Sequence, residues 1–519
     1  MRTLNPAPSR LPVWAAAVLV VIFALAVYFR LSDLGGRNLW TDEAWVALAA
    51  LRASPGEALA ASQSTPPLYL LSVWAAAKIF GGREWALRSV SFLLGVGTLF
   101  LFWRLARSLV SLPASLAALA AVAFSPVMVY YAKELKQYSG DAFFAVLIFY
   151  LTERLLARQG QRGCTALALA GILGLGFSHP LVFILPVAGA VLWFSLPSRP
   201  RPRVAWLGIT WALAFLLYFL LFYRQGTDPE LVDYWKQVAA FPDFSGIKPL
   251  VLWWGRALYE YFWYFLGEWG LYWGPPLLAG GAWFLLDRRR DRVLIYLMGP
   301  IFLAFAAAAL HRYPFMARCG GNRLMVFTAP FLYLVAAVGA TAVFSWLWHQ
   351  RQRWLALALT ALLLAALNPW ENLRENLYPS NNREEIQPLV ERLEELLKPG
   401  DLVYVYYFSI KPFQYYYRGS ALAVCQGKSC LERDLKLAAG EAASRRIWLI
   451  ASHFPDLEFM RIFGRDLLGS RWQETACLTR RGAALFRFES KGPSEAARTQ
   501  SPPGPVQSGS PVPPGDTAY

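Results

Sequence analysis

Two adjacent carboxylates are the first residues in this sequence that could do chemistry. Asp42 and Glu43 lie between two tryptophans, in the run Trp40-Thr41-Asp42-Glu43-Ala44-Trp45. A carboxylate can take the proton of an attacking hydroxyl, and two carboxylates together can hold a divalent cation. A structural interpretation is also open, because Thr41 can cap a helix and acidic residues are favoured in its first turn.

A second polar cluster follows the dipeptide Ser125-Pro126. Its members are, in chain order, Lys133, Glu134, Lys136, Tyr138 and Asp141. If this stretch is helical, Glu134 and Tyr138 share one face, one turn apart. The two lysines place positive charge beside a candidate acid. A solvated loop with aromatic anchors is the structural alternative.

An arginine-rich segment comes late in the chain and contains Tyr313, Arg318 and Arg323. Arginine binds phosphate through its planar fork of donors, so this segment, together with the two lysines, could hold an anionic headgroup. Ordinary contact with lipid headgroups is the alternative. His179, in Ser178-His179-Pro180, lies at another helix end, where a lone histidine is more often structural than a ligand.

These groups together suit one reaction. A hydroxyl that attacks a phosphate-linked lipid needs a base for its proton and cations for the departing phosphate. The carboxylates can supply the base, and the lysines and arginines can supply the cations.

The elements that must position these groups are membrane helices. The chain of 519 residues is 56% hydrophobic and only 16% charged. A spanning helix needs about 20 mostly apolar residues, and helices that are apolar all round belong in a membrane. We therefore predict a polytopic α-helical membrane protein with about 11 to 13 spans. The apolar stretches are 11–31, 88–103, 112–131, 139–152, 164–177, 180–196, 204–223, 271–286, 293–310, 324–346 and 353–368.

The net charge of +16 is best explained by membrane topology. In a soluble protein this charge would suggest nucleic acid, but here arginines mark the predicted cytoplasmic loops, and no nucleic-acid partner is expected. The N-terminus is then cytoplasmic and the C-terminal domain extracytoplasmic. The predicted outer segments are 32–87, 131–139, 178–180, 224–270 and 311–323. All the candidate residues except Asp141 fall in these segments, and Asp141 lies just beyond one of them.

The composition predicts three regions. Residues 1–368 form the membrane part, residues 369–490 a small extracytoplasmic α/β domain, and residues 491–519 a disordered tail rich in Pro, Ser and Gly. Within the middle region, strands are expected near 402–407, 422–425 and 447–452, with helices near 381–398, 410–418 and 431–446. Segments 471–479 and 483–489 resemble a closing hairpin, and the alternation favours a parallel or mixed sheet.

The order and content of these motifs resemble the GT-C superfamily of polytopic glycosyltransferases. The resemblance is greatest to the protein O-mannosyltransferase and aminoarabinose transferase group, glycosyltransferase families 39 and 83. The matching motifs are Leu39-Trp40-Thr41-Asp42-Glu43, Thr65-Pro66-Pro67-Leu68-Tyr69, Phe80 through Ser89, Ser125-Pro126 through Tyr138, and Tyr313-Pro314-Phe315 through Arg323 to Pro330.

The resemblance implies an inverting transfer of a sugar from a polyprenyl-phosphate carrier, in a bacterial plasma membrane. It implies that Asp42, with Glu43 beside it, acts at the acceptor. It further implies that Glu134 is a second acid and that Arg323 lies near the carrier phosphate. Lys136 stands where the family often has Arg, which keeps the charge but loses bidentate geometry.

Several alternatives stay open. A transporter or flippase of a lipid-linked glycan, or a glycan ligase, would also be polytopic. Transporters usually show internal repeats or broken helices with charge at the midplane, and we find no convincing repeat. No cofactor is required, although Asp42 and Glu43 could hold a divalent metal. The sugar and the acceptor cannot be inferred.

Overall fold

The computed structural model describes residues 11–62, 64–159, 163–224, 229–315, 321–366, 384–419, 424–425 and 446–490, with Trp370 and Arg374. The predicted tail 491–519 and the predicted helix 431–446 lie outside these residues, apart from Arg446. The chain divides into two compact units, and each is described by itself. The helical unit is Met1–Leu34 with Ala49–Leu377, and the sheet unit is Gly35–Leu48 with Tyr378–Tyr519.

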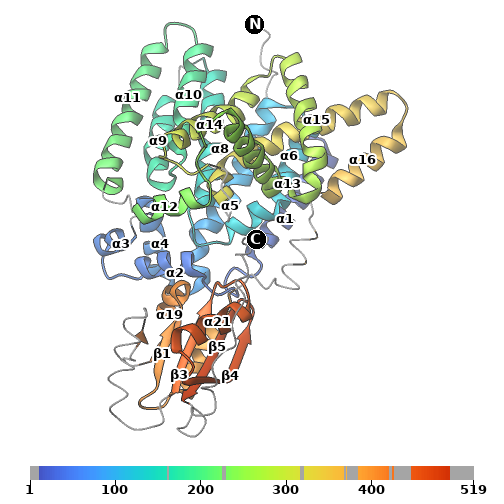
Figure 1. Ribbon diagram of the computed structural model, residues 1–519. Helices are drawn as coiled ribbons and strands as arrows, with labels where there is room; N and C mark the ends of the chain where they lie inside the picture. Colours follow the sequence, from blue (N-terminus) through green and yellow to red (C-terminus); the bar gives the residue numbers. More distant parts are fainter. Residues whose placement is uncertain are drawn as a thin grey trace. The chain divides into compact units, whose positions relative to one another are not determined.

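The helical unit is a bundle of helices joined by short turns (Figure 1). Between its first two helices the chain runs through the sheet unit, where α2 (Thr41–Ala50) begins. The described elements are α1 (Val13–Leu31), α3 (Pro55–Ala61), α4 (Pro67–Phe80), α5 (Glu84–Leu109), α6 (Leu112–Phe124), α7 (Pro126–Ala132), α8 (Tyr138–Ala157), α9 (Cys164–Phe177), α10 (Leu181–Ser195), α11 (Arg201–Tyr218), the π-helix η1 (Phe219–Tyr223), α12 (Pro229–Gln237), α13 (Ile247–Asp287), α14 (Arg292–Ala309), the 3-10 helix η2 (Gly321–Thr328), α15 (Ala329–His349) and α16 (Arg353–Ala366).

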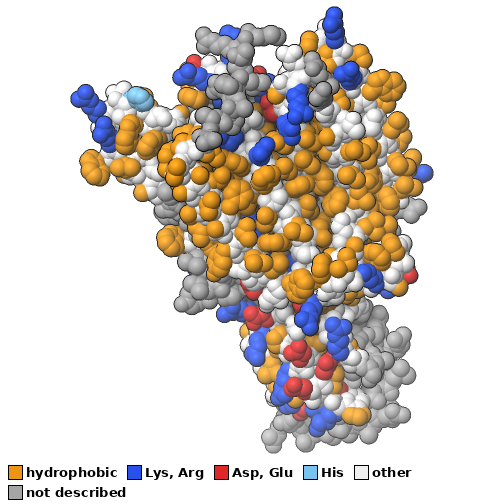
Figure 2. Space-filling model, turned by 180° about the vertical axis from the view of Figure 1, so that it is seen from behind, with side chains coloured by type: hydrophobic (Ala, Val, Ile, Leu, Met, Phe, Trp, Pro, Cys, Tyr) orange, Lys and Arg blue, Asp and Glu red, His pale blue; other side chains and the backbone are white. Residues whose placement is uncertain are grey.

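The protein is a multi-pass membrane protein. Among the described residues, five helical segments are long and apolar enough to cross a membrane, and the bent pair α6–α7 makes a sixth. Shorter apolar helices, including α4, α9 and α10, accompany them. Figure 2 shows hydrophobic side chains spread broadly over the helical unit, with Lys and Arg mostly towards its edges. The number of spans, 11 to 13, stays a prediction.

Two stretches have local structure that the hydropathy pattern did not predict. Residues 224–270, expected as an outer segment, contain α12 and the first half of α13, which bends at Gly267 (φ 74°). Residues 133–137 are a turn between α7 and α8 and are not helical. In both places the hydropathy pattern marks where an apolar span ends but does not reveal how the polar backbone beyond it is hydrogen-bonded.

The break between α6 and α7 sets the direction of the chain before that turn. Pro126 cannot continue α6, and the two helices meet at 56°. The Ser125 hydroxyl accepts a hydrogen bond from the Met128 amide at 3.3 Å and caps α7. It also bonds the Tyr333 hydroxyl of α15 at 2.8 Å, and Tyr333 donates to the Phe265 carbonyl of α13 at 2.6 Å. Two other helices therefore hold the bend.

Helices α13 and α15 touch through a pair of glycines. A Cβ added to Gly339 would lie 2.0 Å from the Leu277 carbonyl oxygen, and one added to Gly281 would lie 2.2 Å from that of Val335. Small residues allow this close approach, which is a common way for membrane helices to associate.

We expect Gly339→Leu to destabilise the helical unit strongly, because the obstructing atoms are backbone and cannot rotate away. Overpacking costs about 1–3 kcal/mol even where side chains can adjust. The matched control is Gly208→Leu in α11, where a Cβ meets nothing within 4 Å. Apparent melting in detergent, followed by size-exclusion chromatography, measures both. Equal melting of the two variants would contradict the packing argument.

The sheet unit carries the predicted mixed sheet (Figure 1). Its strands are β1 (Leu402–Val405), β2 (Val424–Cys425), β3 (Arg446–Ser452), β4 (Trp472–Arg480) and β5 (Ala483–Ser490), in the order β2-β1-β3-β5-β4. β1 is parallel to β2 and β3, whereas β5 is antiparallel to β3 and β4. The predicted hairpin of β4 and β5 is confirmed.

Helices complete the sheet unit. These are α18 (Gln387–Leu396), the short 3-10 turn η3 (Tyr407–Ser409), α19 (Ile410–Tyr416) and α21 (Leu457–Leu468). Helix α21 was not predicted from the sequence. Its start is marked by Asp456, whose carboxylate caps the Phe459 amide at 2.7 Å. Met460 of α21 packs with Leu449 and Phe486 in the core of the sheet.

Candidate active site

The turn 133–137 is fixed by hydrogen bonds from outside it. Ser91 of α5 donates to the Lys136 carbonyl at 3.1 Å. Ser139, in the first turn of α8, donates to the Tyr131 carbonyl at 2.7 Å. The Lys136 carbonyl thus has a partner on another helix, and the amides of Lys133 and Glu134 donate to carbonyls of α7. With these groups paired, the turn need not be helical.

Glu134 is a buried carboxylate close to two tyrosines, Tyr131 and Tyr264. Its side chain is 1% exposed. The hydroxyls of Tyr131 (α7) and Tyr264 (α13) share a hydrogen bond, and both tyrosines lie within electrostatic range of Glu134 and Arg323. The Tyr131 and Tyr138 rings are 4.9 Å apart, and the Arg323 guanidinium lies 5.9 Å from the Tyr138 ring centroid. We call Tyr131, Tyr138 and Tyr264 the tyrosine cage.

Arg323 reaches the cage from the anchored 3-10 helix η2. Asn322 donates from its side-chain amide to the Glu260 carbonyl at 3.2 Å, and Tyr313 donates from its hydroxyl to the Leu324 carbonyl at 2.7 Å. Burial raises the pKa of the Tyr313 hydroxyl well above its usual range, so the group remains a donor at neutral pH. These bonds on both sides of Arg323 hold its backbone in place.

His179 lies in the turn between α9 and α10. Its Nε2 bonds the Ser64 carbonyl at 3.1 Å, and its ring meets Tyr223 at 5.1 Å between centroids. Tyr223 and Tyr313 are both within electrostatic range of the buried Asp141, which connects this turn to the cage. Burial lowers the pKa of the imidazole, with the Ser64 carbonyl acting in the opposite direction. This favours a neutral ring, which is less suited to phosphate than a cation.

Asp42 and Glu43 belong to the sheet unit, in the first turn of α2. Glu43 is fully buried and pairs with Arg37 at 3.4 Å. Asp42 is only partly buried. The chain approaches this segment from Leu34, whose carbonyl accepts a hydrogen bond from buried Arg88 at 3.1 Å. Of the two acids, Asp42 is the more exposed.

The structure therefore brings five of the predicted site residues close to one another in the helical unit. Glu134, Tyr138 and Arg323 form one cluster, and Lys136 lies in the same turn. Tyr313 adjoins Tyr138. Arg318 lies outside the described residues. Asp42 and Glu43 belong to the sheet unit and are described only within it. No group of three or more possible metal ligands occurs in the described part of the chain.

The arrangement in the helical unit suits an anion. It offers the Arg323 guanidinium and the hydroxyls of the tyrosine cage, and Lys136 belongs to the turn 133–137 that carries Glu134. Such donors in a setting shielded from water stabilise a phosphate more strongly than they would in solution. The buried Glu134 carboxylate offsets part of the positive charge.

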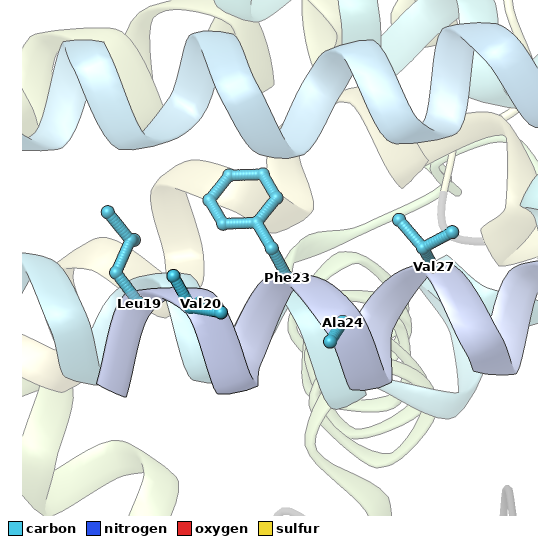
Figure 3. A pocket seen from close by; sticks show the side chains of 5 residues that line it. All are labelled: Leu19, Val20, Phe23, Ala24 and Val27. Atoms are coloured by element: carbon cyan, nitrogen blue, oxygen red, sulfur yellow. The ribbon is translucent and has the colours of Figure 1, made fainter. Parts of the chain in front are cut away.

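An apolar pocket also lies on the helical unit, along α1 (Figure 3). It is lined by Leu19, Val20, Phe23, Ala24 and Val27. It offers no acid, base or cation, so it can neither accept the proton of a hydroxyl nor hold a phosphate. Apolar side chains on a spanning helix suit contact with lipid chains.

One protein family matches part of this chain. Residues 64–222 match the family model described as dolichyl-phosphate-mannose-protein mannosyltransferase. The search of curated proteins finds no match.

Solved structures match over most of the chain. ArnT from Cupriavidus metallidurans in the apo state is 13% identical, with a TM-score of 0.52, over 91% of this chain and 98% of that one. The Archaeoglobus fulgidus oligosaccharyltransferase in complex with Zn and sulfate is 13% identical, with a TM-score of 0.50, over 84% of this chain and 68% of that one. The chain has the GT-C fold.

The match to the GT-C family model divides the site residues. Glu134, Lys136, Tyr138 and His179 fall inside the matched segment 64–222, whereas Asp42, Tyr313 and Arg323 fall outside it. Sequence reasoning missed Tyr264, because nothing in an aromatic-rich helix distinguishes one tyrosine from another. Tyr131 stands in the run Tyr130-Tyr131 next to the polar cluster, a signal that could have identified it.

We expect Glu134→Gln to destabilise the protein by roughly 1–3 kcal/mol, because it leaves the partly buried Arg323 guanidinium without its nearby carboxylate charge. Glu268→Gln is the control, since it removes an exposed carboxylate from α13. Apparent melting temperatures in detergent measure the difference. A Glu134→Gln protein as stable as the control would show that Glu134 does not balance Arg323.

Proposed function

We propose that this GT-C protein moves a sugar from a polyprenyl-phosphate carrier to an acceptor hydroxyl, at the outer face of a bacterial cytoplasmic membrane. The observation that carries the proposal is the cluster of Arg323 with the tyrosine cage beside Glu134. This is a set of donors for an anionic headgroup, built from helices of a membrane-embedded unit.

The base in this mechanism is Asp42. Its carboxylate takes the proton from the acceptor hydroxyl as the oxygen attacks the anomeric carbon. Glu43 is buried against Arg37 and serves to hold the segment. Attack from the side opposite the leaving group inverts the configuration at the anomeric carbon.

The leaving group is polyprenyl phosphate. As the bond between the anomeric carbon and the phosphate oxygen breaks, its electron pair stays on that oxygen. Arg323 and Lys136 offset the negative charge that develops there, with Tyr138 and Tyr313 as neighbours. Arg318 and His179 remain proposed contributors to headgroup binding.

The similar proteins support this proposal. The family model is named for a dolichyl-phosphate-mannose transferase, and residues 64–222 match it. A further solved structure is ArnT from Cupriavidus metallidurans bound to undecaprenyl phosphate, at 13% identity and a TM-score of 0.50. A polyprenyl phosphate, dolichyl in one case and undecaprenyl in the other, is common to both.

A reconstitution experiment separates this function from transport. The protein is placed in liposomes with a labelled polyprenyl-phosphate sugar in one leaflet. We expect release of the carrier phosphate and labelling of an added acceptor. Movement of intact donor between leaflets, without cleavage, would instead identify a flippase, and transfer of only preassembled glycans would identify a ligase.

A further inference from the structure

The segment that contains Asp42 and Glu43 lies at the carboxyl ends of the parallel strands β1 and β3 in the sheet unit. In the order β2-β1-β3, the chain switches direction across the sheet between β1 and β3, and ligands of open α/β sheets bind outside the carboxyl ends of the strands at such a point. Here Thr41 donates from its hydroxyl to the carbonyl of Phe408, which follows β1. Trp40 stacks on His453, which follows β3, at 5.7 Å and 24°.

Further contacts hold the segment on both sides of Asp42. The Leu39 amide donates to the Tyr416 hydroxyl at 2.8 Å. Asn38 and Gln387 exchange two hydrogen bonds, at 3.2 and 3.1 Å. The Lys411 ammonium lies 4.8 Å from the Trp45 ring centroid. The segment is thus a docked part of the sheet unit.

His453 is held by its backbone conformation, by a hydrogen bond and by ring contacts. It adopts a positive φ of 56°, which is uncommon for a residue with a side chain. Its Nδ1 donates to the Glu384 carboxylate at 2.6 Å, and Glu384 is only 6% exposed. Its ring lies 5.7 Å from Trp40 and 5.2 Å from Phe408.

Asp42 is electrostatically connected to this pair. Burial raises the pKa of the Glu384 carboxyl, the hydrogen bond from His453 lowers it, and the charge of Asp42 raises it further. Asp42 is therefore close enough to sense the Glu384–His453 pair, although no mechanism described above uses either residue.

We infer that His453, oriented by Glu384, is a positioning residue that fixes Trp40 and the neighbouring Asp42 for removal of the acceptor proton. This inference rests on the proposed function and gives the sheet unit a role in it. The imidazole orients Trp40 by stacking, and the buried carboxylate orients the imidazole. Loss of either contact allows the Asp42 carboxylate to leave its productive position.

Three variants of His453 separate the two contacts in the full-length protein. His453→Phe keeps an aromatic ring but loses the hydrogen bond. His453→Asn keeps an N–H near the position of Nδ1 and tolerates a positive φ, but loses the ring. His453→Ala loses both. Glu395→Ala, which removes an exposed carboxylate from α18, is the control.

Hydrogen exchange of residues 38–45 is the first readout, because it does not depend on activity. We expect exchange about tenfold faster in His453→Ala, with the Phe and Asn variants in between and the control unchanged. Exchange of the β3 amides shows whether the sheet remains folded. If His453→Ala loosens the sheet as well, the exchange of residues 38–45 in His453→Phe and His453→Asn decides whether His453 holds this segment.

Kinetics provide the second readout. We expect kcat of His453→Ala to fall about ten- to a hundredfold with unchanged donor affinity, and His453→Asn to recover part of it. Native exchange of residues 38–45 in all three variants would overturn the inference. Absence of transfer by the native protein would count against the proposed function, while the exchange result would still decide the role of His453.

Discussion

Asp42→Asn is expected to lower kcat about 10²–10⁴-fold, which is the usual contribution of a general base. The amide is nearly the same size as the carboxylate, so packing at the start of α2 is kept. It cannot take a proton from the acceptor hydroxyl. Because the carrier phosphate is bound by the helical unit in this mechanism, donor affinity should stay within about twofold, a change too small to count as a lost contact.

The control for this prediction is Asp233→Asn, which removes an exposed carboxylate from α12. Turnover is measured with saturating donor, and affinity by competition with polyprenyl phosphate. Full turnover by a well-folded Asp42→Asn protein would exclude Asp42 as the base. A loss of donor affinity equal to the loss of turnover would place Asp42 at the carrier instead.

Arg323→Met is expected to reduce kcat about 10²–10³-fold, as is usual when one group that stabilises developing negative charge is removed. The substitution keeps an unbranched side chain against the Tyr138 ring but removes the guanidinium. Arg323→Lys should fall between the native protein and Arg323→Met, since it keeps the charge and loses the bidentate fork. Affinity for the product polyprenyl phosphate should decrease in the same order.

Arg312→Met serves as the matched control, because Arg312 is an exposed arginine of the same predicted outer segment, 311–323. If both substitutions reduce kcat equally, general surface charge attracts the carrier and Arg323 has no special part. If Arg323→Met binds polyprenyl phosphate as the native protein does, the phosphate site lies elsewhere.

The sequence was most informative where hydropathy and composition decide structure. Apolar stretches correctly marked most of the helices, and strand-like runs correctly marked β1, β3 and the hairpin of β4 and β5. These features depend on local pattern, which the sequence displays directly. The apolar stretch 112–131 was predicted as one segment, but the structure breaks it at Ser125-Pro126, because proline cannot continue a helix.

What could not be predicted depends on partners distant in the chain. Residues 133–137 form a turn because Ser91 of another helix bonds the Lys136 carbonyl. The segment Gly35–Leu48 joins the sheet unit through contacts such as that of Asn38 with Gln387, 349 residues later. No periodicity reports such pairings.

The candidate site divides in the same way. Asp42, Glu134 and Arg323 stood out because charge beside apolar spans is unusual. Tyr264 and the Glu384–His453 pair did not stand out, because each matters only through a residue that is distant in the chain. Glu384 and His453, for example, are 69 residues apart. The roles of the predicted residues remain proposals until the variants are measured.

The most direct test of the central claim is single-turnover transfer from a panel of radiolabelled polyprenyl-phosphate sugars by the purified full-length protein. We expect that one donor is cleaved, with polyprenyl phosphate released and the sugar transferred, and that Asp42→Asn protein fails to do so. Cleavage that Asp42→Asn retains in full, or no cleavage of any donor by folded native protein supplied with a range of acceptors, would contradict the proposed transfer.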